Sequence, residues 1–154
     1  MPRSFAADGV QVEGLAELQR GLRDLVGKDI TRDVLKGANV HYAEFVTAKA
    51  QARARGYGGV RSKAASGLSS RGEQRYAVIR MDGTGSPWLL GAEFGSLRYH
   101  QFPSWTGNRW TAPPDETPGY FLHPTIRDTA EEGAEFYADE LDKALASAFP
   151  DGHL

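Results

Sequence analysis

The chain has 154 residues, a length that suits one domain over 1–154, and 25% of its residues are charged with a formal net charge of −2. Cysteine is absent, which excludes a disulfide scaffold and a thiolate metal site. A net charge this small does not by itself indicate nucleic-acid binding, and no stretch approaches the roughly 20 apolar residues of a membrane span.

The N-terminal part of the chain predicts a short strand and a first helix. Residues 1–9 are expected to be flexible, and the alternating sequence Val10–Glu13 is typical of a strand. Four leucines then recur at spacings of three and four residues, which indicates an amphipathic helix that stops near Gly27. These leucines are Leu15, Leu18, Leu22 and Leu25.

A second, longer helix follows in an alanine-rich sequence. Asp29 or Thr31 can cap its beginning, and helical spacing of apolar residues continues to about Ala54. Gly37 is a weak point inside it and costs about 1 kcal/mol relative to alanine.

The middle of the chain is rich in glycine, serine and aromatic residues. Glycine and serine are abundant from Gly56 to Gly72 without a period, which predicts a long flexible loop over 55–74. Arg75–Met81 predicts a strand, followed by a turn. Trp88–Phe94 fits either one helical turn or a short strand. An irregular segment follows over 96–119, with one strand expected between Trp105 and Trp110.

The last element is predicted to be one continuous helix. It begins at Pro124 or Thr125, because proline is favoured at the first helical position, and it ends at Pro150. Residues 150–154 are expected to be flexible. The order of elements predicts an α+β fold, in which a small antiparallel sheet packs against two or three helices and is joined by long loops.

Charge is distributed unevenly along the chain. Seven basic residues and one acid lie between Lys49 and Arg75, whereas ten acids and two basic residues lie between Asp115 and Asp151. Three interpretations remain open: two solvated faces, complementary charges between neighbouring copies in a ring, or a basic surface for nucleic acid.

The search for catalytic or metal-binding patterns yields little. His41 lies three residues before Glu44, which favours a polar pair on one helix face over a metal site. His123 is expected in a loop or an interface. Glu93 stands in an apolar context, so its carboxylate must find partners. No catalytic, cofactor-binding or metal-binding residue is therefore predicted.

Three sequence features follow one another in an order that is typical of a known protein family. An opening sequence, Val12–Leu25, leads into the alanine-rich helix; Glu93-Phe94-Gly95-Ser96 follows the central strand; and Pro118–Ile126 leads into an acidic final helix. In this order the chain resembles the head–tail joining (gene-product-ten-type) proteins of long-tailed bacteriophages. That family has a Glu-aromatic-Gly-Ser/Thr element and then a Pro-Phe-Leu-x-Pro-Ala element. Thr125 replaces the alanine here.

The resemblance implies a structural, non-enzymatic virion protein of the neck, assembled in the host cytoplasm. It implies a homo-oligomeric ring, commonly six-fold, that contacts the head-completion (stopper) protein and the tail terminator or tail tube proteins. No membrane is involved, and DNA is contacted only if the ring lines the channel. The interface candidates are Arg53, Arg55, Arg61, Lys63, Arg71, Glu93, Phe94, Trp105, Trp110, Glu131 and Glu135.

Three alternatives are kept. The chain could be a subunit of the tail terminator ring, or a nucleic-acid-binding module that uses the basic segment 53–75. A small hydrolase or toxin would require a concave site that joins His41, Glu44 or Glu93.

Overall fold

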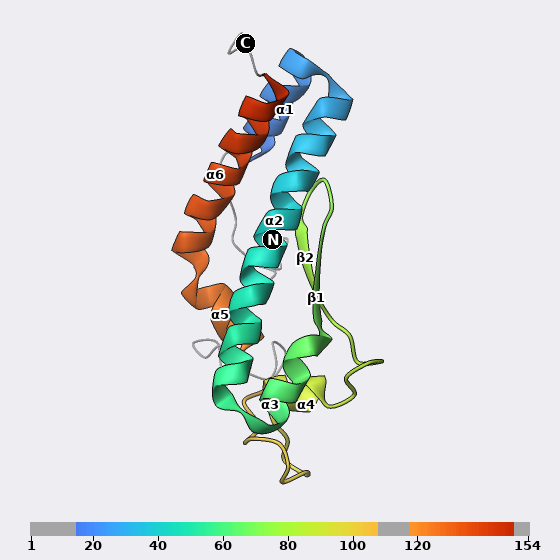
Figure 1. The fold of residues 1–154 in the computed structure, drawn as a ribbon, viewed down its shortest axis with the longest axis vertical. Coiled ribbons are helices and arrows are strands. Elements are labelled where there is room, and N and C mark those ends of the chain that lie inside the picture. The colour runs from blue at the N-terminus through green and yellow to red at the C-terminus, as the bar shows by residue number, and fades with distance from the viewer. Residues whose placement is uncertain (1–14, 108–117, 150–154) are drawn as a thin grey trace, which may run out of the picture.

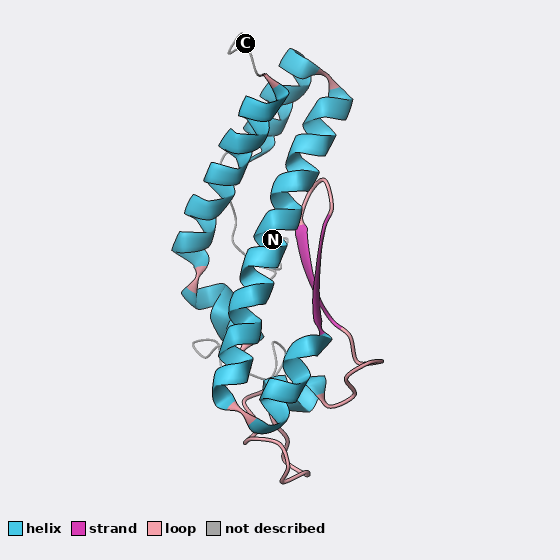
Figure 2. Cartoon of the chain, in the orientation of Figure 1, coloured by secondary structure: helices cyan, strands magenta, loops and turns pink. Residues whose placement is uncertain are grey.

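The structure is a computed structural model that describes residues 15–107 and 118–149. Within them the chain forms six α-helices, one short 3-10 helix and two strands, as Figures 1 and 2 show. In chain order these are α1 (Leu15–Val26), α2 (Lys28–Tyr57), α3 (Gly59–Ala64), η1 (Ala65–Gly67), β1 (Leu68–Gly72), β2 (Ala77–Met81), α4 (Leu89–Phe94), α5 (Leu122–Asp128) and α6 (Ala130–Ala148).

The long helix α2 is the axis of the fold. Its 30 residues span about 45 Å, and α6 runs along one flank while the β1–β2 hairpin lies on the other (Figure 1). Gly27, with φ of 84°, precedes the helix, and the buried Thr31 hydroxyl donates a hydrogen bond to the Gly27 carbonyl at 2.8 Å. Gly58, with φ of 70°, ends it, so α2 runs three residues beyond the predicted end at Ala54.

Two clusters of buried side chains lie along α2. The first joins α2 to α6 and comprises Val34, Leu35, Ala38, Tyr137 and Leu141. The second gathers the C-terminal part of α2 with α3, β1, α4 and α5. It comprises Ala50, Ala54, Ala64, Ala65, Leu68, Leu89, Ala92, Phe121 and Leu122. The alanines let neighbouring backbones approach α2 closely, so the helix serves both clusters.

The hairpin is held tightly to α2. Its strands are antiparallel, with Leu68 opposite Met81 and Gly72 opposite Ala77. A Cβ atom at Gly72 would lie 2.4 Å from the backbone nitrogen of Val40, so only glycine permits this approach. The Asn39 amide also donates hydrogen bonds to two carbonyls of the hairpin turn, at 2.7 and 3.3 Å.

The α+β prediction is confirmed, since a small antiparallel sheet packs against helices. Of the two alternatives for Trp88–Phe94, the helix is observed, as α4. The predicted strand over 10–13 and the flexible termini 1–9 and 150–154 lie outside the described residues. Trp105–Gly107 do not form a strand, and the rest of that predicted strand also lies outside them.

The predicted flexible loop over 55–74 is wrong. The segment contains the end of α2, then α3, η1 and β1. Gly58 and Gly59, both with positive φ, turn the chain back, and Ala64, Ala65 and Leu68 are then buried in the second cluster. Burial of these few apolar side chains outweighs a composition that locally favours a loop.

The predicted continuous final helix is also wrong, because it is two helices. α5 begins at Leu122, two residues before Pro124, and the helix breaks at Thr129, where φ is −102° and ψ is 13°. The Thr129 hydroxyl donates a 2.6 Å hydrogen bond to the Thr125 carbonyl. A side chain that bonds the backbone in this way competes with regular helix and commonly bends it.

Candidate functional site

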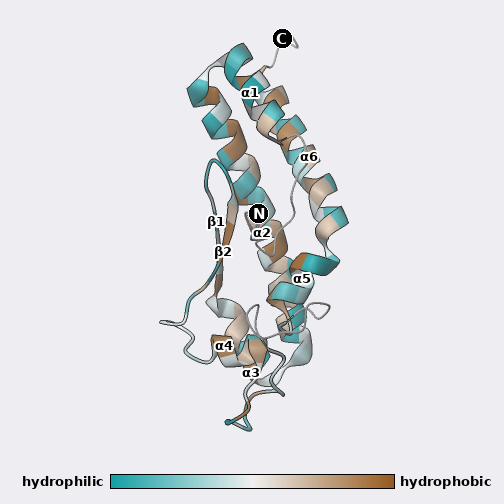
Figure 3. Cartoon of the chain, turned by 180° about the vertical axis from the view of Figure 1, so that it is seen from behind, coloured by the Kyte–Doolittle hydropathy of each residue, from teal (hydrophilic) through white to brown (hydrophobic). Residues whose placement is uncertain are grey.

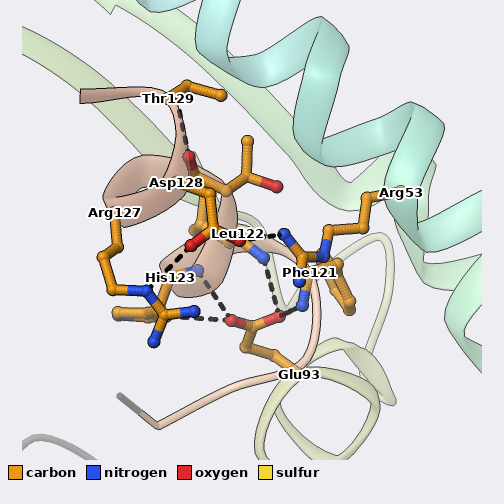
Figure 4. Close-up of polar contacts among 9 residues, drawn as sticks. Arg53, Glu93, Phe121, Leu122, His123, Arg127, Asp128 and Thr129 are labelled. Carbon is orange, nitrogen blue, oxygen red and sulfur yellow. Dashed lines mark hydrogen bonds and ion pairs between the residues drawn. The ribbon is translucent and has the colours of Figure 1, made fainter. Parts of the chain in front are cut away.

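The most constrained polar group in the described residues is the carboxylate of Glu93. It lies on the last turn of α4, is 0% exposed and points at the beginning of α5 (Figure 4). Oε2 accepts hydrogen bonds from the backbone N–H groups of Phe121 and Leu122, each at 3.0 Å. Oε1 accepts from the His123 backbone N–H at 3.0 Å, and His123 Nδ1 lies 2.9 Å from it. Glu93 therefore caps α5 from a distant part of the sequence.

Burial and hydrogen bonding act on this carboxylate in opposite directions. Desolvation by burial raises the pKa of Glu93, whereas hydrogen bonds from the His123 side chain and from three backbone N–H groups lower it. The hydrogen bonds prevail, and the pKa lies below the ordinary value. The carboxylate is thus ionised at neutral pH, with both oxygens occupied by donors.

Two glycines permit close approaches at this junction, Gly119 to the Glu93 carboxylate and Gly95 to the loop that follows α4. A Cβ atom at Gly119, where φ is +95°, would lie 2.2 Å from Glu93 Oε1. A Cβ atom at Gly95, where φ is +81°, would lie 2.1 Å from the carbonyl oxygen of Ser104. Both positions combine a backbone conformation that favours glycine with a contact that excludes any side chain. Beside them, the Phe94 ring lies 5.1 Å from the His123 ring, centroid to centroid.

Arg61 joins α3 to the same region. Its guanidinium lies over the Tyr57 ring at 4.4 Å and over the Tyr120 ring at 4.2 Å. The Tyr120 hydroxyl donates a hydrogen bond to the Ser104 carbonyl at 2.8 Å. Arg61, Tyr57 and Tyr120 therefore fasten the end of α2, α3 and the segment before α5 to the loop after α4.

The loop after α4, residues 96–106, is held by its own hydrogen bonds. The Ser96 hydroxyl accepts from the N–H groups of Arg98 and Tyr99, and the Ser96 N–H donates to the Pro103 carbonyl at 2.9 Å. The Phe102 ring packs against Gly91 of α4, where an added Cβ would lie 2.8 Å from it. The loop is thus fixed to the helix that carries Glu93.

This fixed loop nevertheless exposes large apolar side chains. They come from this loop and from residues 88–90 at the beginning of α4, at the end of the molecule where α3 and α4 lie (Figure 3), and we name the set the apolar end patch. Leu97 is 86% exposed, although its backbone belongs to a hydrogen-bonded loop. The patch comprises Trp88, Leu90, Leu97, Tyr99 and Trp105.

Ion pairs connect α2 with α5 and α6. Lys49 contacts Glu132 at 2.8 Å, Arg53 contacts Asp128 at 2.9 Å, and His41 contacts Glu140. The hydrogen bond to Asp128 is the first cause that raises the pKa of Arg53. The basic middle and the acidic C-terminal part of the sequence therefore partly neutralise each other within one chain, an arrangement not among the interpretations drawn from the sequence.

The predicted interface residues are separated in the structure. Arg53 is in the α2–α5 ion pair, Arg61 lies between two tyrosines, and Arg71 contacts Glu73 at 3.0 Å. Glu93 is buried, Phe94 is half-buried beside it, and Trp105 belongs to the apolar end patch. Fully at the surface are Arg55, Lys63, Glu131 and Glu135, while Trp110 lies outside the described residues.

The residues of the hydrolase alternative do not meet in one site. His41 contacts α6, whereas Glu93 contacts the beginning of α5, and Glu44 is exposed on α2. Arg53 of α2 contacts Asp128 at the C-terminal end of α5. His41 lies twelve residues before Arg53, about 18 Å away along the helix axis, and is therefore far from the beginning of α5, where Glu93 lies. Across residues 15–107 and 118–149, no three histidine, aspartate or glutamate side chains are grouped to hold a metal ion.

Sequence reasoning missed the partners of Glu93 and most of the apolar end patch. Trp88, Leu90, Leu97 and Tyr99 were not singled out, because large apolar residues in a sequence predict burial rather than exposure. None of the helices in the described part of the chain has the length and apolar character needed to cross a membrane. No family model, curated protein or solved structure matches the chain.

Proposed function

We propose that this chain is a structural, non-enzymatic subunit of the neck of a long-tailed bacteriophage, within the connector that joins head to tail. The observation that carries the proposal is the bond between the two elements on which the resemblance rests. Glu93, from the Glu-Phe-Gly-Ser element, caps the backbone of Phe121, Leu122 and His123 in the second element. Two short motifs that form one unit in space are a stronger basis for the resemblance than two independent matches.

The chemistry of this unit supports a structural role. A catalytic carboxylate needs an oxygen that is free to accept a proton or to contact a substrate. Four N–H donors occupy Glu93, and its side chain is 0% exposed, so it offers neither. Its hydrogen bonds hold the beginning of α5 against α4, and the loop 96–106 is bonded to the same end of α4.

The apolar end patch supports a role in assembly. Five large apolar side chains are exposed within residues 88–105, and such exposure is typical of protein–protein contact sites. Tryptophan, tyrosine and arginine are the residue types enriched at the centres of such contacts, and Trp88, Tyr99, Trp105 and Arg98 lie here.

Two alternatives remain, a tail terminator subunit and a nucleic-acid-binding module. The second is less supported, because Lys49, Arg53 and Arg71 contact carboxylates and Arg61 lies between tyrosines. A module of that kind would bind DNA with an affinity that falls steeply and linearly on a logarithmic salt scale. The purified chain is expected to show no such slope.

The decisive experiment deletes the gene for this chain from the phage genome and examines the lysate by electron microscopy. We expect filled heads and finished tails that are not joined, and we expect purified chain to restore joined particles. A tail terminator would instead alter the tails themselves. Joined, infectious particles without the chain would refute the proposal, as would failure to locate it in the neck of the intact virion.

A further inference from the structure

The β1–β2 hairpin has one edge that the described residues leave open. The Glu73 N–H donates to the Tyr76 carbonyl at 2.9 Å, and the Asp82 N–H donates to the Gly67 carbonyl at 2.8 Å. In an antiparallel ladder such pairs alternate with pairs that exchange no hydrogen bonds. The second kind includes three residues of β2, whose backbone N–H and C=O groups therefore point away from β1: Ala77, Ile79 and Met81. We name these groups the outer edge of β2; none of them forms a hydrogen bond within the described residues.

The two faces of β2 define what fits along this edge. Ile79 and Met81 pack against the second cluster, so an added strand should place apolar side chains on that face. On the other face Arg80 is exposed, lies opposite Ser69 and forms no ion pair with the described residues. The outer edge of β2 therefore fits an extended segment in which apolar residues alternate with polar or acidic ones. Main-chain hydrogen bonds supply the affinity in such strand addition.

A segment of this chain has that pattern. Val10–Glu13 alternates valine with glutamine and then glutamate, lies outside the described residues and is followed only by Gly14 before α1 begins. We propose that Val10–Glu13 binds the outer edge of β2 of the same chain as a third, antiparallel strand. This inference does not depend on the proposed function.

The alternation of the segment matches that of β2 in one register. When Val10 lies opposite Met81, Val12 lies opposite Ile79, and both valines extend the apolar face. The acidic residue of the segment then lies on the exposed face, diagonally from Arg80 and within reach of its long side chain. A slip by one residue would turn both valines to the exposed face, so the pattern of side chains specifies the register.

The position of α1 favours the antiparallel direction. After the single residue Gly27, α1 folds back along the N-terminal half of α2 (Figure 1). Its 12 residues span about 18 Å, so Leu15 lies near the level of Asn39 on α2. Asn39 donates the hydrogen bonds to the hairpin turn. A segment that lies along the hairpin and ends at Leu15 therefore runs toward the turn, whereas β2 runs away from it.

The test measures backbone amide hydrogen exchange in the purified full chain, residue by residue, by nuclear magnetic resonance. The amides of Val78 and Arg80 face β1 and are hydrogen-bonded with or without a third strand. Those of Ile79 and Met81 face the outer edge, and a third strand should slow their exchange roughly tenfold or more relative to exposed amides. Fast exchange at these two positions, beside slow exchange at the other two, would overturn the inference.

Two variants with the same new side chain test the alternation. Val12→Asp places a carboxylate on the apolar face, so the amides of Ile79 and Met81 should lose roughly tenfold or more of their protection. Gln11→Asp, one position away, places the carboxylate on the exposed face beside Arg80 and should leave the protection unchanged. Continued slow exchange of the amides that face β1 shows that the hairpin is intact in both variants. Equal effects of the two substitutions would count against the proposed pairing.

A nuclear Overhauser contact identifies the occupant. In the proposed register Gln11 and Arg80 form a pair without hydrogen bonds, so their Hα atoms should lie in contact. This contact and the slow exchange should be independent of protein concentration, because the pairing is within one chain. Protection that is lost on dilution would overturn the inference in favour of a second copy. A contact from a different segment to Arg80 would overturn it in favour of that segment.

Discussion

Two regions of this molecule use charged side chains to join distant segments, and they do so under opposite conditions. At the α4–α5 junction one carboxylate, Glu93, is 0% exposed and accepts hydrogen bonds from four N–H groups. Along the α2–α6 seam, ion pairs lie at the surface; in one of them the Lys49 and Glu132 side chains are 37% and 56% exposed. The seam has two ion pairs, Lys49–Glu132 and His41–Glu140, but the single carboxylate of the junction should contribute far more to stability.

The reason lies in what replaces each contact when it is broken. Water can solvate Lys49 or Glu132 as soon as its partner leaves, so an exposed pair contributes little. Water cannot reach the backbone N–H groups of Phe121 and Leu122 without opening the core, so their loss of a partner costs free energy. Substitutions in the two regions measure this difference.

The largest effect is expected for Glu93→Ala. The substitution leaves three backbone N–H groups at the beginning of α5 without an acceptor and opens a cavity against Phe121. We expect the free energy of unfolding to fall by about 3–5 kcal/mol. Urea unfolding followed by circular dichroism measures it. A loss near that of an exposed surface substitution would show that the cap is dispensable.

Glu93→Gln is the matched variant, because it keeps the shape and one acceptor oxygen. Its amide NH₂ would face N–H donors on one side, so it should recover only part of the lost stability. Full recovery by glutamine would mean that the charge itself contributes nothing.

Gly119→Ala should have the next largest effect. The new Cβ would lie 2.2 Å from Glu93 Oε1 in a conformation with φ of +95°, so both the cap and the backbone must shift. We expect a loss of roughly 2–4 kcal/mol in the free energy of unfolding. Gly83→Ala is the control, since no atom lies within 4 Å of the Cβ that it adds. Equal urea midpoints for the two variants would contradict the geometry of the junction.

The same comparison explains what could be read from the sequence. The apolar surroundings of Glu93 showed that the carboxylate must have partners, but they did not identify them. Its partners are backbone N–H groups of residues 121–123, and every residue except proline supplies such a group. Only the chain's path through space brings these donors to Glu93, so no side-chain pattern could reveal them.

The errors in predicted structure have a similar cause. Helical periodicity identified α2 and most of α6, because those helices bury one stripe along their length. Between Gly56 and Gly72 the local composition favoured a loop, yet burial of Ala64, Ala65 and Leu68 against α2 imposes helix and strand. The break at Thr129 depends on one hydroxyl that bonds the Thr125 carbonyl, which spacing does not encode.

A third prediction concerns acid. The pKa of Glu93 in the folded chain lies below its ordinary value of 4.5, so its carboxylate stabilises the fold fully above that pH. As pH falls below 4.5 and through the folded pKa, this stabilisation is lost. Asp128 and Glu140 also have lowered pKa values, but Asp128 is exposed and the His41 and Lys143 partners of the less exposed Glu140 are themselves exposed, so these pairs should be weakened by high salt. In high salt, therefore, the free energy of unfolding of the wild type should still fall below pH 4.5, and that of Glu93→Gln should fall less. Identical pH profiles for the two proteins would contradict this account.

The smallest effect is expected on the seam. In a double-mutant cycle of Lys49→Ala and Glu132→Ala, the coupling free energy should be below about 1 kcal/mol and should shrink with added salt. Both side chains are solvated when apart, and Lys49 also lies 5.1 Å from the Phe45 ring, so Lys49→Ala alone removes some contact that the cycle subtracts. A coupling as large as the loss in Glu93→Ala would reverse the comparison, since exposed ion pairs would then hold α6 to α2. A small coupling would instead assign that task to the apolar contacts of Leu35, Tyr137 and Leu141 in the first cluster.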